Sequence, residues 1–392
     1  MPLLPRTVII LGFVSLLNDA ASEMITPLLP IFLTAALGAG PAIVGLVEGV
    51  AEATASVVKL ISGWLADRGW NSKRLVLSGY ALSNGVRPLI GLALGWPLLL
   101  MLRFADRIGK GLRTAPRDAI IAGAAAASLR GRSFGFHRSM DHAGAVIGPI
   151  AAWLLLTNGV PLARVFFWSV IPGACVLLLI VFGLPRDAPR AQATSPATLR
   201  WNVLHPQIKA MVIAAGGLAL ASVPEVFVVL WARDAGLKIE WVPLLWACAS
   251  FAKMFTAWPA GALSDRFGRA KVLAIGWSMR IAILLLIATL DVRDLSVWLL
   301  FVLYSMSLAF TESAERSLIG DHASATERGT AFGYYHLTSG LLVLPGAVLF
   351  GLVWEQWSSS AAFIAAACVT AAAAATMYLL SRSTPVVEKL ER

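Results

Sequence analysis

The chain alternates long apolar stretches with short polar loops along its whole length. An α-helix needs about 20 predominantly apolar residues to cross the hydrocarbon core of a bilayer. Stretches of that kind predict twelve membrane-spanning helices, at residues 7–34, 42–64, 74–95, 97–121, 132–156, 163–184, 207–232, 242–264, 271–291, 296–320, 329–352 and 357–380. The pattern therefore predicts an all-α membrane protein.

One polar segment returns in the second half of the chain. GWLADR at residues 63–68 is followed, 198 residues later, by GALSDR at residues 261–266. Further identities at the same offset are Lys73/Lys271, Leu75/Leu273, Gly131/Gly329, Phe134/Phe332 and Gly135/Gly333. The repeat unit is too long for a solenoid and indicates two similar halves. We expect a six-helix bundle at 1–185, a cytoplasmic linker rich in Pro, Ser, Thr and Arg at 186–206, and a second six-helix bundle at 207–392.

Composition agrees with a membrane location. The chain is 58% hydrophobic and only 14% charged, whereas a soluble domain carries roughly 25% charged residues. Cys175, Cys248 and Cys368 all lie inside apolar stretches. Their spacing suits neither a metal site nor a disulfide framework, and we expect no cofactor.

The formal net charge of +10 could suggest a nucleic-acid partner, but the placement of the basic residues argues against one. Lys and Arg gather in alternate loops, as the positive-inside rule describes for cytoplasmic loops. We therefore expect an inner-membrane protein that functions as a monomer and has both termini in the cytoplasm. The basic residues of these loops are Arg68, Lys73, Arg74, Arg130, Arg132, Arg186, Arg190, Arg200, Arg266, Arg269, Lys271, Arg328, Arg382, Lys389 and Arg392.

The repeated loops GWLADRGWNSKR (63–74) and GALSDRFGRAK (261–271) resemble the signature loop of the major facilitator superfamily, G-x-L-a-D-R-x-G-r-[RK]. The first copy departs from it, with Trp70 in place of the second glycine. Glycine allows a tight turn, and aspartate can accept backbone N–H groups at a helix start. The resemblance implies two six-helix bundles related by pseudo-twofold symmetry, with a substrate site near the midplane. It also implies a conformational latch formed by Gly63, Asp67, Arg68, Gly261, Asp265 and Arg266.

GAVIGP, from Gly144 to Pro149, is similar to a span-5 motif that the family's antiporters and exporters carry. Gly144 and Gly148 would let two helices approach closely, and Pro149 would bend the span. Plain small-residue packing explains the same residues. The motif favours export.

Ionisable side chains inside predicted spans are costly, so each one is a functional candidate. In the fourth span, Arg103, Asp106, Arg107, Lys110, Arg113 and Arg117 project within an arc of roughly 120° and cannot face lipid. Arg103, followed by Gly109 and Gly111, loosely resembles a family motif associated with proton coupling; an ion pair of Arg103 with Asp106 is the alternative. The residues predicted for proton coupling are Asp19, Glu23, Glu48, Glu52, Arg103 and Asp106.

A second set of polar and aromatic residues is predicted to line the substrate cavity: His137, Asp141, Glu225, Trp231, Glu312, Glu315 and His336. His137 and Asp141 share one helix face and suit a proton relay. Together with His142 they could instead ligate a transition metal if other helices supplied partners; simple hydrogen bonding is the plainer interpretation. Asn18 and Asp19 leave sodium coupling open.

These observations predict a secondary active transporter that binds a small-molecule substrate, protons and the lipid bilayer. The leading interpretation is a proton-coupled antiporter that exports a small charged or zwitterionic organic solute by alternating access. The alternatives are a proton symporter for uptake and an exporter of metal ions or metal chelates. ATP-driven transport is not favoured, because the chain contains no Walker P-loop. A membrane enzyme is not favoured, because the chain contains no nucleophile elbow or H-E-x-x-H motif. A sensor would be expected to carry a soluble domain.

Overall fold

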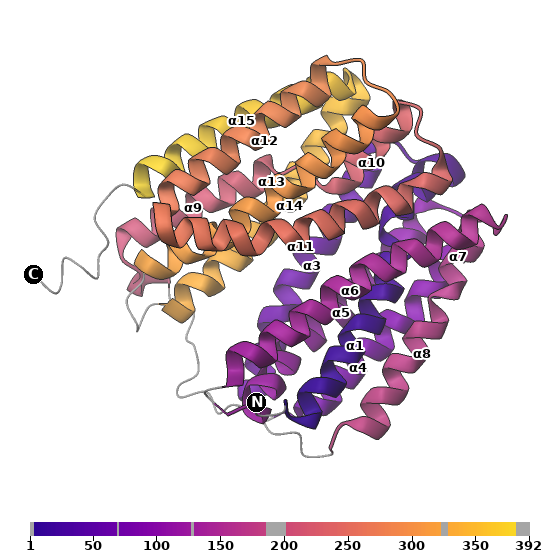
Figure 1. Cartoon of the computed structure of the whole chain (residues 1–392), viewed down its shortest axis with the longest axis vertical. Helices are drawn as coiled ribbons and strands as arrows, with labels where there is room; N and C mark the ends of the chain where they lie inside the picture. The colour runs from indigo at the N-terminus through magenta and orange to yellow at the C-terminus, as the bar shows by residue number, and fades with distance from the viewer. Residues whose placement is uncertain (1–3, 69, 127–128, 186–200, 323–327, 382–392) are drawn as a thin grey trace, which may run out of the picture. The chain divides into compact units, whose positions relative to one another are not determined.

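The computed structural model describes residues 4–68, 70–126, 129–185, 201–322 and 328–381, and every regular element within them is a helix (Figure 1). Most of the predicted linker, at 186–200, lies outside the described residues, as do the basic residues predicted at 382–392. The contacts of the chain divide it into two compact units.

Unit 1 comprises Met1–Gly38, Thr54–Pro196 and Lys238–Ala247. In it, α1 packs against α6 and α8, and α4 packs against α5. Apolar side chains of these helices form one core that includes Leu11, Tyr80 and Val176. The elements are α1 (Arg6–Glu23), η1 (Thr26–Leu28), α2 (Leu29–Ile31), η2 (Phe32–Ala36), α4 (Ser72–Val86), η3 (Arg87–Leu92), α5 (Trp96–Ala124), α6 (Arg130–Thr157), α7 (Leu162–Trp168), α8 (Val170–Leu178), η5 (Leu179–Gly183) and η7 (Ile239–Trp241).

Unit 2 comprises Ala39–Ala53, Ala197–Leu237 and Cys248–Arg392. In it, α9 packs against α14 and α15, and α12 packs against α13 and α15. Two long helices, α3 (Pro41–Asp67) and α11 (Val242–Phe267), contribute residues to both units. The remaining elements are η6 (Trp201–Val203), α9 (Pro206–Ala221), α10 (Glu225–Asp234), α12 (Arg269–Thr289), α13 (Leu295–His322), α14 (Arg328–Gln356) and α15 (Ser359–Ser381).

Each of the twelve predicted spans falls on helical structure. Within the described residues, nine helical stretches are long and apolar enough to cross a membrane. The other three predicted spans, 74–95, 97–121 and 242–264, correspond to α4 with η3, to α5 and to α11. α5 carries the predicted stripe of charged residues, which lowers its hydropathy below that of an ordinary span.

The first helix of each repeat is interrupted at the same place. α1 ends at Glu23 and is followed by the 3₁₀ turn η1, which contains Pro27. α9 ends at Ala221, 198 residues later, and three residues without helical structure precede α10. Proline lacks the backbone N–H that a continuous helix needs. In the second break, the hydroxyl of Tyr304 donates a hydrogen bond to the Val223 carbonyl at 2.5 Å, which satisfies one of the freed backbone groups.

The signature loops differ in detail from the expectation. Gly63 and Gly261 lie inside α3 and α11, and the tight turn is made by Gly268, whose φ of 94° is favourable for glycine alone. The aspartates of the motif lie near helix C-termini, not at helix starts. The helix start after the first loop is capped by Asn71, whose side chain accepts the Arg74 N–H at 3.0 Å.

Candidate functional site

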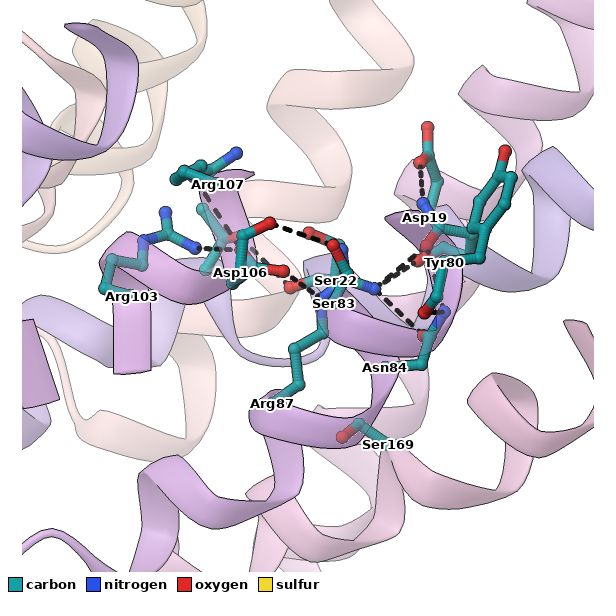
Figure 2. A network of polar contacts seen from close by, with 12 residues as sticks. Asp19, Ser22, Tyr80, Ser83, Asn84, Arg87, Arg103, Asp106, Arg107 and Ser169 are labelled. Carbon is teal, nitrogen blue, oxygen red and sulfur yellow. Dashed lines mark hydrogen bonds and ion pairs between the residues drawn. The ribbon is translucent and has the colours of Figure 1, made fainter. Parts of the chain in front are cut away.

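Three arginines surround the buried carboxylate of Asp106 in unit 1 (Figure 2). The Nε of Arg87 lies 3.0 Å from one carboxylate oxygen, and Arg103 and Arg107 lie 3.5 and 3.8 Å from the other. All four residues are at least 95% buried. The charged stripe predicted for the fourth span therefore faces the interior of unit 1, and Arg103 does form an ion pair with Asp106.

Arg87 is the central residue that sequence reasoning missed. It stands at the end of α4, where Pro88 follows and the α-helix gives way to η3. One Nη of Arg87 donates to the backbone and side-chain oxygens of Asn18, at 3.2 and 3.0 Å, and to the side-chain oxygen of Asn84 at 3.1 Å. The signal was present, because Arg87 is an ionisable residue inside the predicted span 74–95.

A second group of polar contacts extends this network along α5. Arg113 donates to the hydroxyl of Ser83 at 2.7 Å, and that hydroxyl donates to the Asp106 carbonyl at 2.9 Å. The guanidinium of Arg113 also lies 4.6 Å from the centre of the Tyr80 ring, within cation–π distance. α4 and α5 are thereby joined by buried polar contacts as well as by apolar packing.

The glycines of GAVIGP bring α6 directly against α1. A methyl group added to Gly148 would lie 2.3 Å from the Ala20 carbonyl oxygen, and one added to Gly144 would lie 2.3 Å from the Leu16 carbonyl oxygen. Contacts that short are not available to a larger residue. The predicted close approach of two helices at this motif is thus present, and its partner is the helix that carries Asp19.

This crossing gathers several of the predicted polar residues. Gly144 faces the Cβ of Asp19 on α1, and Asp141 lies one turn earlier on α6. The Ser15 hydroxyl donates to the Asp141 carboxylate. His137 and Arg138 lie 3.6 and 3.7 Å from the other carboxylate oxygen. The charge of Asp141 acts on Asp19, so the two carboxylates are electrostatic neighbours.

Asn18 connects the two groups of unit 1. Its side-chain N–H donates to Asp19 at 3.0 Å, while its oxygen atoms accept from Arg87, which in turn pairs with Asp106. Asp19 and Asp106 therefore belong to one hydrogen-bonded chain that runs from α1 through the end of α4 to α5 (Figure 2).

A polar cluster in unit 2 is built on the second helix break. Glu225, the first residue of α10, accepts hydrogen bonds from the Lys253 ammonium at 2.9 and 3.1 Å and from the Ser305 hydroxyl at 2.5 Å. These partners come from α11 and α13. The arrangement places a carboxylate and an ammonium group side by side next to an interrupted helix.

The other residues predicted for coupling lie elsewhere. Glu23, at the end of α1, accepts a hydrogen bond from the Trp246 indole N–H at 2.8 Å. Glu48 and Glu52 are half-buried in the part of α3 that belongs to unit 2. Their participation in coupling stays a prediction.

The remaining predicted cavity residues of unit 2 lie on three helices. Trp231 is buried in α10, and Glu312 is exposed on α13. Glu315, also on α13, accepts a hydrogen bond from the Trp277 indole at 3.0 Å. His336 on α14 packs against the ring of Tyr335, with ring centres 5.1 Å apart.

The predicted latch is described only in part, because the side chains of Asp67 and Asp265 lie outside the description. The guanidinium of Arg68 lies 3.9 Å from the centre of the Trp64 ring, and that of Arg266 lies 5.3 Å from the Phe267 ring. Lys73 donates to the carbonyls of Val181 and Leu184, at 3.2 and 2.5 Å, and so caps the end of η5.

A transition-metal site at His137, Asp141 and His142 was one alternative from the sequence. Within the residues that can be described, no group of three or more His, Cys, Asp or Glu side chains is placed to hold a metal ion.

Comparison with known proteins gives a family. The sequence model of the Major Facilitator Superfamily matches residues 11–310 and 226–392. An uncharacterised MFS-type transporter of Methanocaldococcus jannaschii is 29% identical over 361 residues, which cover 90% of this chain and 89% of the relative. An uncharacterised protein of Mycobacterium tuberculosis is 30% identical over 370 residues, which cover 89% of this chain and 87% of the relative.

Solved transporter structures share the fold. A bacterial homologue of the human lysosomal transporter Spinster, in an inward-facing and unoccupied conformation, matches with a TM-score of 0.74 and 16% identity, over 96% of both chains. A POT family transporter in complex with 5-aminolevulinic acid matches with a TM-score of 0.80 and 13% identity, again over 96% of both chains. The predicted fold class, an all-α membrane protein with the major facilitator fold, is confirmed.

Proposed function

The chain belongs to the major facilitator superfamily, a family of secondary transporters, and we propose that it is a proton-coupled antiporter that exports a small charged or zwitterionic organic solute by alternating access. It would do so as a monomer in the inner membrane, with both termini in the cytoplasm. The two predicted bundles, 1–185 and 207–392, would be its moving parts, and the repeated loops would act as the latch.

The main observation that supports proton coupling is the crossing of α1 and α6. The glycines of the antiporter-like motif place Asp19 next to the helix turn that carries Asp141. Two neighbouring carboxylates inside a membrane bundle repel each other when both are charged, and one bound proton removes that repulsion. The motif that favours antiport and the carboxylates that suit proton binding are therefore one structural feature.

The Asp106 cluster supports a positioning role in the same process. Arg87 links Asp106 to Asn18, which is adjacent to Asp19 and hydrogen-bonded to it. Arg103 and Asp106 would thus act on the coupling carboxylate through Arg87 and Asn18. Glu23, Glu48 and Glu52 remain proposed contributors.

The helix break between α9 and α10 is the basis for the proposed charge of the solute. Interrupted helices at corresponding positions of two repeats indicate binding sites in transporters, and Glu225 with Lys253 presents both signs of charge there. A solute with an ammonium or a carboxylate group could replace one partner of this ion pair. The similar POT family structure holds 5-aminolevulinic acid, which carries both groups.

Proton coupling can be tested with the full-length protein in liposomes that contain a pH-sensitive dye. Pooled amino acids, amines and carboxylates are added with and without an imposed proton gradient. We expect the active solute to drive protons in the opposite direction, and we expect Asp19→Asn and Asp141→Asn to abolish this proton flux. Asp291→Asn is the matched control, because Asp291 is exposed and pairs with Arg293 at the surface.

Two results would contradict the proposed mechanism, and a third would contradict the assignment of the proton site. Proton flux in the same direction as the solute would identify a symporter. It would also contradict the interpretation of GAVIGP as a motif that favours antiport. Solute transport without any proton movement across a wide pH range would exclude proton coupling. Normal flux in both carboxylate variants would place the proton site elsewhere.

A further inference from the structure

Arg280 is a buried cation with no carboxylate beside it. It lies on α12 and is 7% exposed. One Nη donates to the Thr311 hydroxyl at 2.7 Å and to the Ser307 carbonyl at 3.3 Å, both on α13. Its Nε is fully buried and has no hydrogen-bond partner among the described residues. Among the residues described, no Asp or Glu oxygen lies within ion-pair distance of this guanidinium.

A charge in this position is costly. Burying an uncompensated charge in a low-dielectric environment costs several kcal/mol, and buried polar groups in native proteins are satisfied with few exceptions. Arg280 stands near the middle of α12, about 15 Å from either end of the helix at 1.5 Å per residue. A lipid headgroup at the membrane surface is therefore too far away to compensate it.

The internal repeat allows the surroundings of Arg280 to be compared with those of a buried arginine in unit 1. A methyl group on Gly79 would meet Arg113 at 2.9 Å, and one on Gly276 would meet Thr311 at 2.4 Å. Because Arg113 and Thr311 are 198 residues apart, these two helix crossings are equivalent. In unit 1 the arginine is on α5 and donates to Ser83 of α4; in unit 2 the arginine is on α12 and donates to Thr311 of α13.

The two crossings differ in their counter-charge. Asp106 acts electrostatically on Arg113 in unit 1. The residue 198 positions after Asp106 is Tyr304, whose hydroxyl is engaged with the Val223 carbonyl. Arg280 itself corresponds to Leu82 of unit 1, so unit 2 has a buried arginine at a position of its own and a neutral side chain at the position of the aspartate.

We propose that Arg280 binds a carboxylate group of the transported solute, which supplies the missing negative charge. A guanidinium recognises a carboxylate through two parallel N–H···O bonds, and its Nε is available for one of them. Glu225 accepts a hydrogen bond from Ser305, and Arg280 donates to the Ser307 carbonyl on the same helix, so a solute with an ammonium group as well could also reach Glu225. The proposal deepens the proposed function by naming the solute class, and it rests on that function only for transport itself.

The test is thermal unfolding of the purified full-length protein in detergent, with pairs of probes that differ in one charge. The pairs are acetate and acetamide, benzoate and benzamide, and 4-aminobutyrate and 4-aminobutyramide. At about ten times its Kd, a carboxylate that binds Arg280 is expected to raise the Tm by about 1–2 °C, and its amide is not. Arg280→Gln should lose the shift, and Arg293→Gln, at an exposed arginine, should keep it.

Thr311→Asp provides a second test that does not depend on removing Arg280. It places a carboxylate at the position that already accepts a hydrogen bond from the guanidinium. We expect a higher Tm without ligand and no further shift from any carboxylate. Equal shifts with acids and amides, no shift with any acid, or a carboxylate shift that survives Arg280→Gln would each overturn the proposal.

Failure of this proposal can be separated from failure of proton coupling. The Tm shift is an equilibrium binding measurement and requires no proton gradient. A carboxylate shift without solute-driven proton flux would support Arg280 and contradict the coupling mechanism. The reverse combination would contradict the role of Arg280 alone.

Discussion

Asp106 is the residue on which the buried positive charge of unit 1 depends. Its carboxylate is fully buried and contacts Arg87, Arg103 and Arg107. Removal of one partner from a buried ion cluster costs about 3–5 kcal/mol, because it leaves a charge uncompensated. We therefore expect Asp106→Asn to lower stability by about that amount, measured as a loss of Tm in detergent. Asp291→Asn, at the surface pair with Arg293, should have no measurable effect. An equal Tm for the two variants would contradict the proposed role of Asp106.

The stripe of charged residues on α5 could be predicted because helical periodicity places its members on one face, and lipid excludes charges. The partners on other helices could not be predicted in this way. Arg87 approaches Asp106 because α4 gives way to η3 at that residue, and a change of helix type is not encoded by hydropathy. The contact between Lys253 and Glu225 likewise depends on how α10 and α11 pack.

At the scale of the helix, the crossing of α1 and α6 gives a steric prediction. A methyl group on Gly148 would lie 2.3 Å from the Ala20 carbonyl oxygen, whereas one on Gly135 of the same helix meets nothing within 4 Å. We expect Gly148→Ala to cost about 1–3 kcal/mol through overpacking and to impair transport. Gly135→Ala should be neutral or stabilise the helix by up to about 1 kcal/mol. Tm and transport rate measured for both variants check this, and equal behaviour would show that the crossing tolerates a side chain.

The apolar pattern predicted the helices, but it did not predict where the first helix of each repeat is interrupted. Pro27 and Pro224 mark the breaks in the sequence, although several other prolines, such as Pro116 and Pro149, lie inside continuous helices. The difference depends on tertiary contacts, such as the Tyr304 hydroxyl that satisfies the Val223 carbonyl. In the second signature loop the second glycine of the motif, Gly268, makes the turn with a positive φ.

At the scale of the whole molecule, the distribution of basic loops predicts the orientation in the membrane. With the native cysteines replaced, Asn71→Cys should react with a membrane-impermeant maleimide only after the cells are permeabilised. Asn158→Cys should react in intact cells, since three predicted spans separate it from Asn71 and place it in an outer loop of the predicted topology. Both positions are exposed. The opposite labelling pattern would invert the proposed orientation and reverse the direction of transport.

The repeat at an offset of 198 residues was visible in the sequence and extends through the structure. α4 and α12, α5 and α13, and α6 and α14 begin 197 to 199 residues apart. The shared positions lie in and around the two signature loops and in the first turns of α6 and α14. The polar residues at equivalent positions have diverged, as Asp106 and Tyr304 illustrate, so the repeat predicted the architecture but not the chemistry of either unit.

The close packing of Gly144 and Gly148 against α1 also bears on motion. Backbone atoms of the two helices meet without intervening side chains, so separating them would open a gap that nothing in the pair could fill. α1 and α6 should therefore move as one body, and their central amides should be among the last in unit 1 to exchange hydrogen with solvent. Any change in the access of water to Asp19 and Asp141 must then come from displacement of other helices, while the two aspartates keep a fixed separation throughout the cycle.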